Sequence, residues 1–355
     1  MKGGVFMRCY LFMADGEYEE EVALELRRKI KELYAKSKIL FFSFRNPGVF
    51  AERGFAEILG SRTRGTLKEW ASICQALWRR RNLRERRIFI GQNLALLALV
   101  ALLGGKKVTL ILLAGAHSFF LSSWRLFLIR RFARTVLSDD ASLAETLRRH
   151  NIPAYFVGNI LADLLHPADF TFHHGKKPIF SFFPRKESFE EDLEFYLDLS
   201  ERIAEKSSLY FLLALPMGTS LRTAKEIAFA KGWVFRESFE GEIIEGYLAK
   251  GRVYLNLTRF SSEALAQAEY VASADQPVLV TAAGLGKTAV PVQLGKMEET
   301  LALLFHSVSL FEYNQAMGAQ YGKRGALERI ASFLLWGVVE DPSLSHQLRL
   351  LQKRG

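Results

Sequence analysis

The sequence predicts an α/β protein made of two doubly wound domains that face each other across a cleft. Short apolar segments rich in valine, isoleucine and phenylalanine alternate with helical segments, which is the pattern of parallel βαβ units. Residues 166–178 contain proline, glycine and histidine and interrupt this alternation, and 355 residues suffice for about two domains. We therefore expect one domain at 1–168 and a second at 178–338. A C-terminal helix at 339–355 is the candidate for a return to the first domain.

The first domain is expected to open with a buried strand and an amphipathic helix. Residues 17–35 carry apolar side chains at helical spacing, with glutamates at the start and basic residues toward the end, as the helix dipole favours. The apolar run 94–103 is shorter than the roughly 20 residues that span a bilayer, so we interpret it as a buried helix. The strands expected in this domain are 8–13, 38–44, 87–91, 107–115, 135–140 and 154–159.

The second domain repeats the alternation of strands and helices. The terminal segment 325–353 is also expected to be helical. The other helices expected here are 188–205, 219–231 and 261–268, and the strands are 178–183, 208–215, 252–257 and 289–292.

Composition indicates a globular protein of a reducing compartment. Hydrophobic residues make up 49% and charged residues 24% of the chain, which excludes a disordered protein. The two cysteines, Cys9 and Cys74, lie far apart and lack metal-ligand spacing, so we expect no disulfide framework. We also expect no metal site and no cofactor. The start of the chain does not have the pattern of a signal peptide, and we expect a cytoplasmic location.

Positive charge is concentrated in the first half of the chain. Residues 1–170 carry a formal charge of +11 and residues 171–355 carry −1, and the densest basic stretch is 79–87. Such a surface suits anionic lipid headgroups, a phosphorylated substrate or nucleic acid. The alternative is a solvated helix face with local ion pairs. We expect no nucleic-acid binding, because no helix-turn-helix, RNA-recognition motif or zinc finger is visible.

The stretch VTAAGLGKTAVP at 280–291 ends on the Gly-Lys-Thr of a phosphate loop but does not complete that motif. Thr281 stands where the motif requires its first glycine, and Pro291 follows where a helix should begin. An ATP-binding phosphate loop is therefore disfavoured, and the glycines need another explanation.

Several blocks in the same order resemble lipid-A-disaccharide synthase and its relatives. The clearest is 136–165, where Phe-Val-Gly-Asn at 156–159 is followed by Asp-Leu. Residues 89–120, 282–296 and 321–335 are similar to other blocks of that family. The resemblance implies a GT-B glycosyltransferase with two Rossmann-like domains, a nucleotide-sugar donor, which we expect to be a UDP-sugar, and a lipid-linked acceptor. It also implies that Gly158 and Asn159 lie at the cleft or hinge.

On the donor side, the resemblance places a helix N-terminus toward the donor diphosphate. That helix would begin at Asp275 as N-cap, followed by Gln276 and a proline, both of which suit a helix start. Gly284 and Gly286 belong to the same donor-side block and would end the helix. A strand at 277–281 is the alternative, because its residues are β-branched. Arg185 stands in the loop where relatives approach phosphate, although the glycine and serine of that loop are absent.

The acidic residues that the family uses for donor and acceptor recognition are missing here. His117 is the titratable group left in the loop after residues 107–115, so we expect it to be the base, with Asp15 or Glu17 as second candidates. The alternatives are a histidine bonded to a backbone carbonyl and acids that merely favour a helix start.

These observations predict an inverting, metal-independent hexosyltransferase that works at the membrane surface. The basic first half would hold the protein on the cytoplasmic face of an anionic membrane, where a lipid-linked acceptor is found. The alternative is a non-catalytic descendant of GT-B enzymes that binds a sugar-nucleotide, a lipid or a protein partner, which the missing acidic residues favour.

Overall fold

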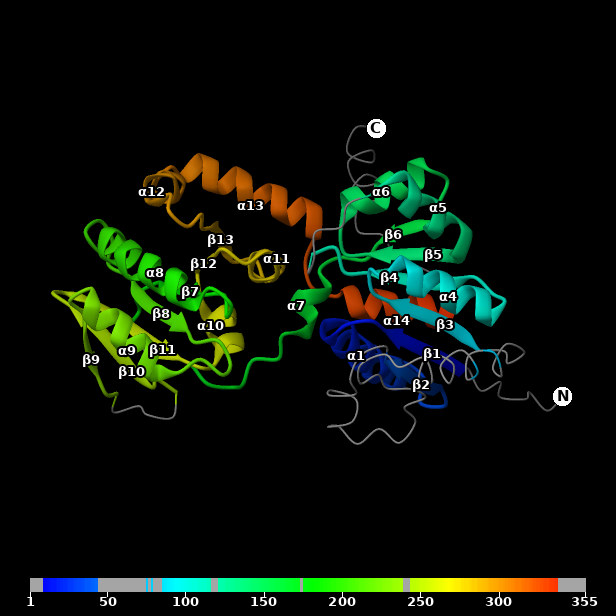
Figure 1. Ribbon diagram of the computed structural model, residues 1–355, viewed down its shortest axis with the longest axis horizontal. Coiled ribbons are helices and arrows are strands. Elements are labelled where there is room, and N and C mark those ends of the chain that lie inside the picture. The colour runs from blue at the N-terminus through cyan, green and yellow to red at the C-terminus, as the bar shows by residue number, and fades with distance from the viewer. Residues whose placement is uncertain are drawn as a thin grey trace. The chain divides into compact units, whose positions relative to one another are not determined.

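The chain folds into two compact units, each built on its own β-sheet (Figure 1). The computed structural model describes residues 9–43, 75, 78, 85–115, 121–172, 175–238 and 243–337. Unit 1 contains the chain up to Leu164 and again from Gln320 onward, and unit 2 spans Leu165–Ala319. Within the described residues the chain returns to the first unit at Gln320, and residues 339–355, where the return was expected, lie outside the described residues. The physical reason is helix α14, Ala326–Trp336, whose apolar face packs against unit 1.

Unit 1 is a six-stranded, fully parallel sheet in the order β2-β1-β3-β4-β5-β6. All six expected strands are present, which confirms the prediction for this unit. Their bounds are β1 Cys9–Ala14, β2 Lys38–Ser43, β3 Arg86–Ile90, β4 Val108–Leu112, β5 Ala133–Ser138 and β6 Ala154–Phe156. Among the elements that the structure describes with bounds, the helices of unit 1 are α1 Glu17–Leu33, α4 Leu94–Gly104, α5 Ser123–Phe132, α6 Ala141–Arg149, α7 Ile160–Leu164 and α14.

Helix α4 is the buried helix that its uninterrupted apolar sequence predicts. Asn93 caps its start by accepting a hydrogen bond from the amide of Leu96 at 3.2 Å, and Gly105 ends it in the left-handed conformation with φ 62°. Leu97 and Val100 are fully buried in the core that α4 and α5 form with the sheet. Within the described ranges, none of the helices has the length and apolar character needed to cross a bilayer.

Unit 2 has a seven-stranded mixed sheet in the order β13-β12-β7-β8-β11-β10-β9. Its first five strands in that order are parallel, and β10 and β9 add an antiparallel edge. The prediction missed β9, β10 and β12. β9 and β12 are only three and four residues long, and β10 pairs with β11 through a tight turn at Gly251. The bounds are β7 Ile179–Phe183, β8 Tyr210–Ala214, β9 Val234–Arg236, β10 Gly246–Lys250, β11 Val253–Thr258, β12 Tyr270–Ser273 and β13 Thr288–Pro291.

Residues 276–284 form a helix, so the helix prediction is confirmed over the strand alternative. Pro277 lies in its first turn, where a missing N–H costs nothing. At the sheet edge, the side chain of Asn314 accepts from the amide of Ala289 at 2.7 Å and donates to its carbonyl at 3.0 Å, which covers edge strand β13. The helices of unit 2 are α8 Phe189–Ala204, α9 Leu221–Ala230, α10 Ser261–Gln267, α11 Gln276–Gly284, α12 Met297–Phe305 and α13 Ser307–Tyr321, the last of which leads into unit 1.

Candidate functional site

The strand order of unit 2 reverses between β7 and β12. The chain passes from β7 to β8 on one side and later places β12 and β13 on the other side. In open α/β sheets, ligands bind outside the carboxyl ends of the strands at such a reversal. The β7/β12 switch point, as we call it, comprises the loops that leave these two strands, Phe183–Arg185 and Ser273–Asp275.

The two loops of the β7/β12 switch point are bonded to each other. The hydroxyl of Ser273 donates to the carbonyl of Phe183 at 2.9 Å and accepts from the amide of Asp275 at 3.0 Å. The buried hydroxyl of Tyr196 donates to the same Phe183 carbonyl at 3.3 Å, and burial raises the pKa of Tyr196 well above its usual range. The two loops of the switch point are therefore held together by neutral hydrogen bonds.

Helix α11 begins at the β7/β12 switch point. Asp275 is its N-cap residue, with φ −94° and ψ 117°, but the Asp275 carboxylate does not accept a bond from the helix amides. The first turn therefore presents the amides of Gln276 and Val278, whereas Pro277 has no N–H. A helix start with uncapped amides is a place where phosphate groups bind well.

Arg185 lies beside this helix start and is held by a buried carboxylate. Its guanidinium donates to Asp192 through Nη2 at 2.7 Å and Nε at 3.2 Å, and its backbone amide donates to the same carboxylate at 2.7 Å. Asp192 is fully buried, while a third of the Arg185 side chain is exposed. The hydrogen bond to Asp192 raises the pKa of Arg185, so the exposed part of its guanidinium remains a fixed positive charge.

Asp275 and Arg185 interact electrostatically at the switch point. Burial raises the pKa of Asp275, Arg185 lowers it, and the carboxylates of Glu187 and Asp192 raise it further. The structure thus brings together Arg185, Asp275 and Gln276, which the sequence predicted separately as donor-binding residues. Gly284 and Gly286 lie at the other end of α11, about 13 Å away along the helix, where they terminate it.

Unit 1 has a corresponding reversal between β1 and β3, and Asp15 lies there. The Asp15 carboxylate accepts from the amide of Asn93 at 2.9 Å, and its own amide donates to the carbonyl of Ile90 at 3.3 Å. Gly91 has φ 148°, and a Cβ at this position would come within 2.3 Å of the Asp15 carboxylate. Asp15 is thus placed at the carboxyl edge of the sheet, and it also supports the start of α4.

Of the three residues expected in catalysis, Asp15 is the one whose side chain the structure describes. Glu17 is the first residue of α1, directly after the switch point. His117 lies outside the described residues, in the segment 116–120 that follows β4. The described residues just before that segment, Ala114 and Gly115, are held by a buried carboxylate.

That carboxylate belongs to Asp139, at the end of β5, which the sequence interpretation did not single out. It accepts from the amide of Ala114 at 2.7 Å and from the amide of Gly115 at 3.2 Å. Desolvation raises the pKa of Asp139 to about 7, because these two hydrogen bonds offset its complete burial only in part. The signal was available, since Ser-Asp-Asp ends the strand expected at 135–140.

Gly158 and Asn159, expected at the cleft or hinge, contact the C-terminal return of the chain. Asn159 donates its amide to the carbonyl of Lys323 at 3.1 Å, and its side chain accepts from Ala162 at 2.8 Å. Gly158 has φ 92°, and a Cβ there would lie 3.0 Å from the Lys323 carbonyl and 2.3 Å from the Arg329 guanidinium. These close approaches explain a glycine at this position without a ligand.

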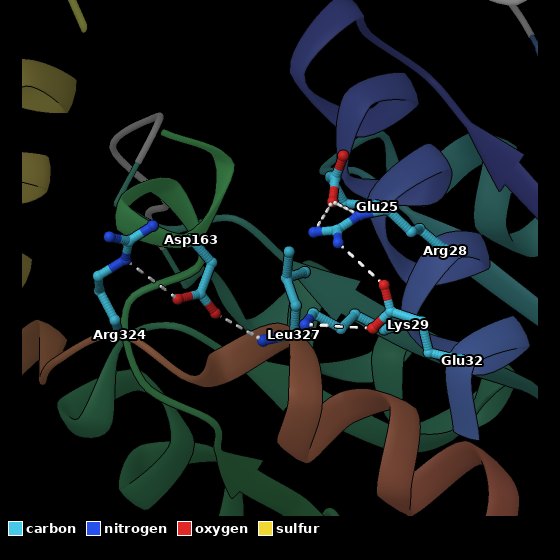
Figure 2. Close-up of polar contacts among 7 residues, drawn as sticks. All are labelled: Glu25, Arg28, Lys29, Glu32, Asp163, Arg324 and Leu327. Atoms are coloured by element: carbon cyan, nitrogen blue, oxygen red, sulfur yellow. Dashed lines mark hydrogen bonds and ion pairs between the residues drawn. The ribbon is translucent and has the colours of Figure 1, made fainter. Parts of the chain in front are cut away.

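Asp163, from the same block, anchors the start of α14 (Figure 2). Its carboxylate accepts from the amides of Gly325 at 2.7 Å and Leu327 at 2.8 Å, and Arg324 lies 3.9 Å away. On α1, an exposed cluster of Arg28 and Lys29 pairs with Glu25 and Glu32. The α1 cluster is solvated and contributes little, whereas Asp163 satisfies amides at a helix start.

Comparison with solved structures finds proteins of similar fold at low sequence identity. S. aureus MnaA, solved with UDP, matches with a TM-score of 0.60 and 12% identity over 95% of this chain and 99% of that chain. The UDP-GlcNAc 2-epimerase from Neisseria meningitidis bound to UDP-GlcNAc gives 0.58 and 11% over 93% and 100%. The glycotransferase of kitacinnamycin gives 0.54 and 13% over 93% and 98%.

These similarities confirm the predicted fold class, a GT-B-like arrangement of two Rossmann-like domains. No protein-family model and no curated protein matches the sequence. The resemblance to lipid-A-disaccharide synthases therefore rests on the sequence blocks alone. A UDP-GlcNAc 2-epimerase and a glycotransferase share this fold. The fold therefore does not choose between epimerisation and sugar transfer.

Proposed function

We propose that this chain is a glycosyltransferase that binds a UDP-sugar at the β7/β12 switch point and transfers the sugar to a lipid-linked acceptor. The observation that supports it most is the uncapped start of α11 beside the fixed guanidinium of Arg185. Solved proteins of this fold carry UDP or UDP-GlcNAc. A diphosphate leaving group needs positive charge and amide donors, and a helix start supplies them without a metal.

The acceptor side of the proposal rests on unit 1. An inverting transfer needs a base within hydrogen-bond reach of the acceptor hydroxyl. His117 remains our first candidate and Asp15 the second, with Glu17 adjacent to it. The carboxylate of Asp139 accepts hydrogen bonds from the amides of Ala114 and Gly115. Since these two residues lead into the segment 116–120, Asp139 would help to position His117.

Helix α5 supports the proposed contact with an anionic membrane surface. Trp124 and Phe127 are 66% and 53% exposed and stack with their ring centroids 5.5 Å apart. Arg130 and Arg131 follow in the last turn of the same helix. Exposed aromatic side chains next to basic residues are typical of surfaces that lie in the headgroup region of a bilayer.

The first experiment is isothermal titration calorimetry with UDP on the parent and two single variants. Asp275→Asn removes a negative charge from the proposed phosphate site, so we expect UDP to bind about threefold to tenfold more tightly. Asp198→Asn removes an exposed carboxylate that pairs with Lys231, more than one turn along α8 from Asp192, and serves as the matched control. A gain in affinity cannot result from misfolding, which makes this variant more informative than a loss.

Two results would contradict the donor site. The first is no heat of binding with UDP or UDP-GlcNAc at millimolar concentration. The second is an equal change in affinity for Asp275→Asn and Asp198→Asn, because a purely general charge effect would not depend on position. A bound UDP-sugar whose sugar is neither transferred nor hydrolysed would leave the site in place but argue against catalysis.

A non-catalytic, sugar-nucleotide-binding descendant is the second candidate function. The observation that favours it is the pairing of Arg185 with Asp192, together with a carboxylate at the helix start where a diphosphate would lie. Incubation with UDP-GlcNAc and membrane lipids, followed by chromatography of the nucleotides, separates the candidates. Release of UDP supports transfer, conversion to the C2 epimer indicates an epimerase, and an unchanged nucleotide supports the binding protein.

A further inference from the structure

A cavity of about 680 Å³ opens at the amino ends of β3, β4 and β5 in unit 1. It lies at the sheet edge opposite the carboxyl ends that form the β1/β3 reversal, and the proposed function does not use it. Five cationic side chains and one carboxylate line its wall: Arg86, Arg87, Lys106, Lys107, Arg134 and Glu85. We call it the amino-edge pocket. Such an excess of one charge in a concave surface attracts counter-ions.

Part of this charge serves the neighbouring helices. Arg86 donates to the carbonyl of Leu334 in the last turn of α14. The buried guanidinium of Arg87 lies so close to Gly104, at the end of α4, that a Cβ on this glycine would overlap it. Cations near helix C-termini offset the partial negative charge there. These contacts explain Arg86 and Arg87, but they do not explain Arg134.

Arg134 is directed by an irregularity in the sheet. Val108 pairs with Ala133 and Thr109 pairs with Thr135, so Arg134 is an extra residue between two successive pairs of parallel strands. Bulges are rare between parallel strands, and they commonly re-aim a side chain next to a functional site. Arg134 is exposed and makes no hydrogen bond or ion pair with the part of the chain that the structure describes.

A threonine with little exposed surface lies next to Arg134 in the same pocket. Thr135 is 8% exposed, lines the pocket and shares a sheet face with its register partner Thr109. Across the described ranges, the hydroxyl of Thr135 forms no hydrogen bond. This hydroxyl is not among the buried unpaired side-chain atoms of the described residues, so it remains accessible from the pocket and can donate to a ligand with acceptor atoms.

We propose that the amino-edge pocket binds a phosphate-bearing anion. Arg134 would supply a charge-assisted donor, Thr135 a neutral donor, and Lys106 and Lys107 the surrounding positive potential. The cavity has the size of ordinary small-molecule sites, which is larger than one phosphate group requires. The ligand class is therefore an organic phosphate or diphosphate, either free or as a lipid headgroup. This site is separate from the donor site and does not depend on it.

The test is calorimetric titration of inorganic pyrophosphate at low ionic strength into the full chain. Arg134→Gln and Thr135→Val should each weaken binding about tenfold, because each removes one hydrogen bond to a charged ligand. Arg236→Gln, which neutralises an exposed strand arginine in unit 2, is the matched control and should leave binding unchanged. The effect of the unit 1 variants, rather than binding itself, locates the site.

Thr135→Val also shows whether weaker pyrophosphate binding results from the lost hydroxyl or from a less stable protein. The variant replaces a hydroxyl that has no partner within the described residues by a methyl group of similar shape, so the melting temperature of the ligand-free variant should stay the same or rise. Lower affinity together with undiminished stability supports the proposal. Pyrophosphate affinity that stays within about twofold of the parent in both unit 1 variants would overturn it.

A vesicle assay identifies the source of the phosphate. Sedimentation with phosphatidylcholine vesicles containing phosphatidylglycerol is compared for the parent, Arg134→Gln and Arg236→Gln. Loss of sedimentation in Arg134→Gln alone assigns the pocket to a lipid headgroup, and pyrophosphate binding without such a loss assigns it to a free phosphate. If the parent binds neither pyrophosphate nor these vesicles, the proposal is wrong.

Discussion

Asp139 makes unit 1 less stable as the pH rises, whereas most carboxylates of folded proteins have the opposite effect. Its carboxyl group is fully buried, and desolvation raises its pKa from 3.8 to about 7. A folded-state pKa above the unfolded one means that the folded protein binds more protons between these two values. The contribution of Asp139 to stability is therefore fully present below about pH 3.8 and is lost as the pH rises to about 7.

The size of this effect follows from the difference between the two pKa values. Each pKa unit of difference corresponds to about 1.4 kcal/mol of folding free energy. The difference of about three units therefore corresponds to at most about 4 kcal/mol. Asp139→Asn mimics the protonated carboxyl at every pH, and its side-chain oxygen can keep the bond to the amide of Ala114. The variant should therefore be more stable than the parent above about pH 7 and no more stable below about pH 4.

Thermal unfolding followed by circular dichroism at about pH 4 and about pH 8 measures this difference. For a unit of this size, the melting temperature of Asp139→Asn should exceed that of the parent by up to about 10 °C at the higher pH. Asp198→Asn, which removes an exposed carboxylate of unit 2, is the control for a general loss of negative charge. A stability difference between Asp139→Asn and the parent that is the same at both pH values would refute the reasoning.

Three further changes test contacts that hold the return helix and the sheet edge, each measured by urea unfolding. Gly158→Ala should destabilise unit 1 by about 1–3 kcal/mol, because φ is 92° and the added Cβ meets a carbonyl at 3.0 Å. The control is Gly251→Ala, at φ 59° with open space around it, which should cost about 1 kcal/mol. Asp163→Asn should cost about 1–2 kcal/mol through weaker acceptance from two amides at the start of α14. Asn314→Ala should cost about 1–3 kcal/mol in unit 2, since both backbone groups of Ala289 lose their partner; an unchanged midpoint would show that water replaces the side chain.

The candidate donor site shows which part of a site can be predicted from local sequence. Asp275, followed by a residue and then a proline, is a helix start by local rules, and the structure has the helix there. Arg185 was predicted to lie near phosphate only because it stands in the loop where similar proteins approach phosphate. Its fixation by Asp192 was not predicted, because that acid stands among other acids in the first turn of α8 and nothing local distinguishes it.

The sequence by itself determined the alternation of strands and helices, the parallel sheet of unit 1 and the helix at 276–284. These features depend on the spacing of apolar residues and on the backbone preferences of proline and glycine, which act over a few residues. Only the tertiary structure decided the antiparallel edge of unit 2, the return of the chain at Gln320 and the bulge that directs Arg134. Each of these depends on pairing or packing between segments far apart in the chain. The free energy of such a contact depends on both segments together, so the sequence of either segment alone does not predict it.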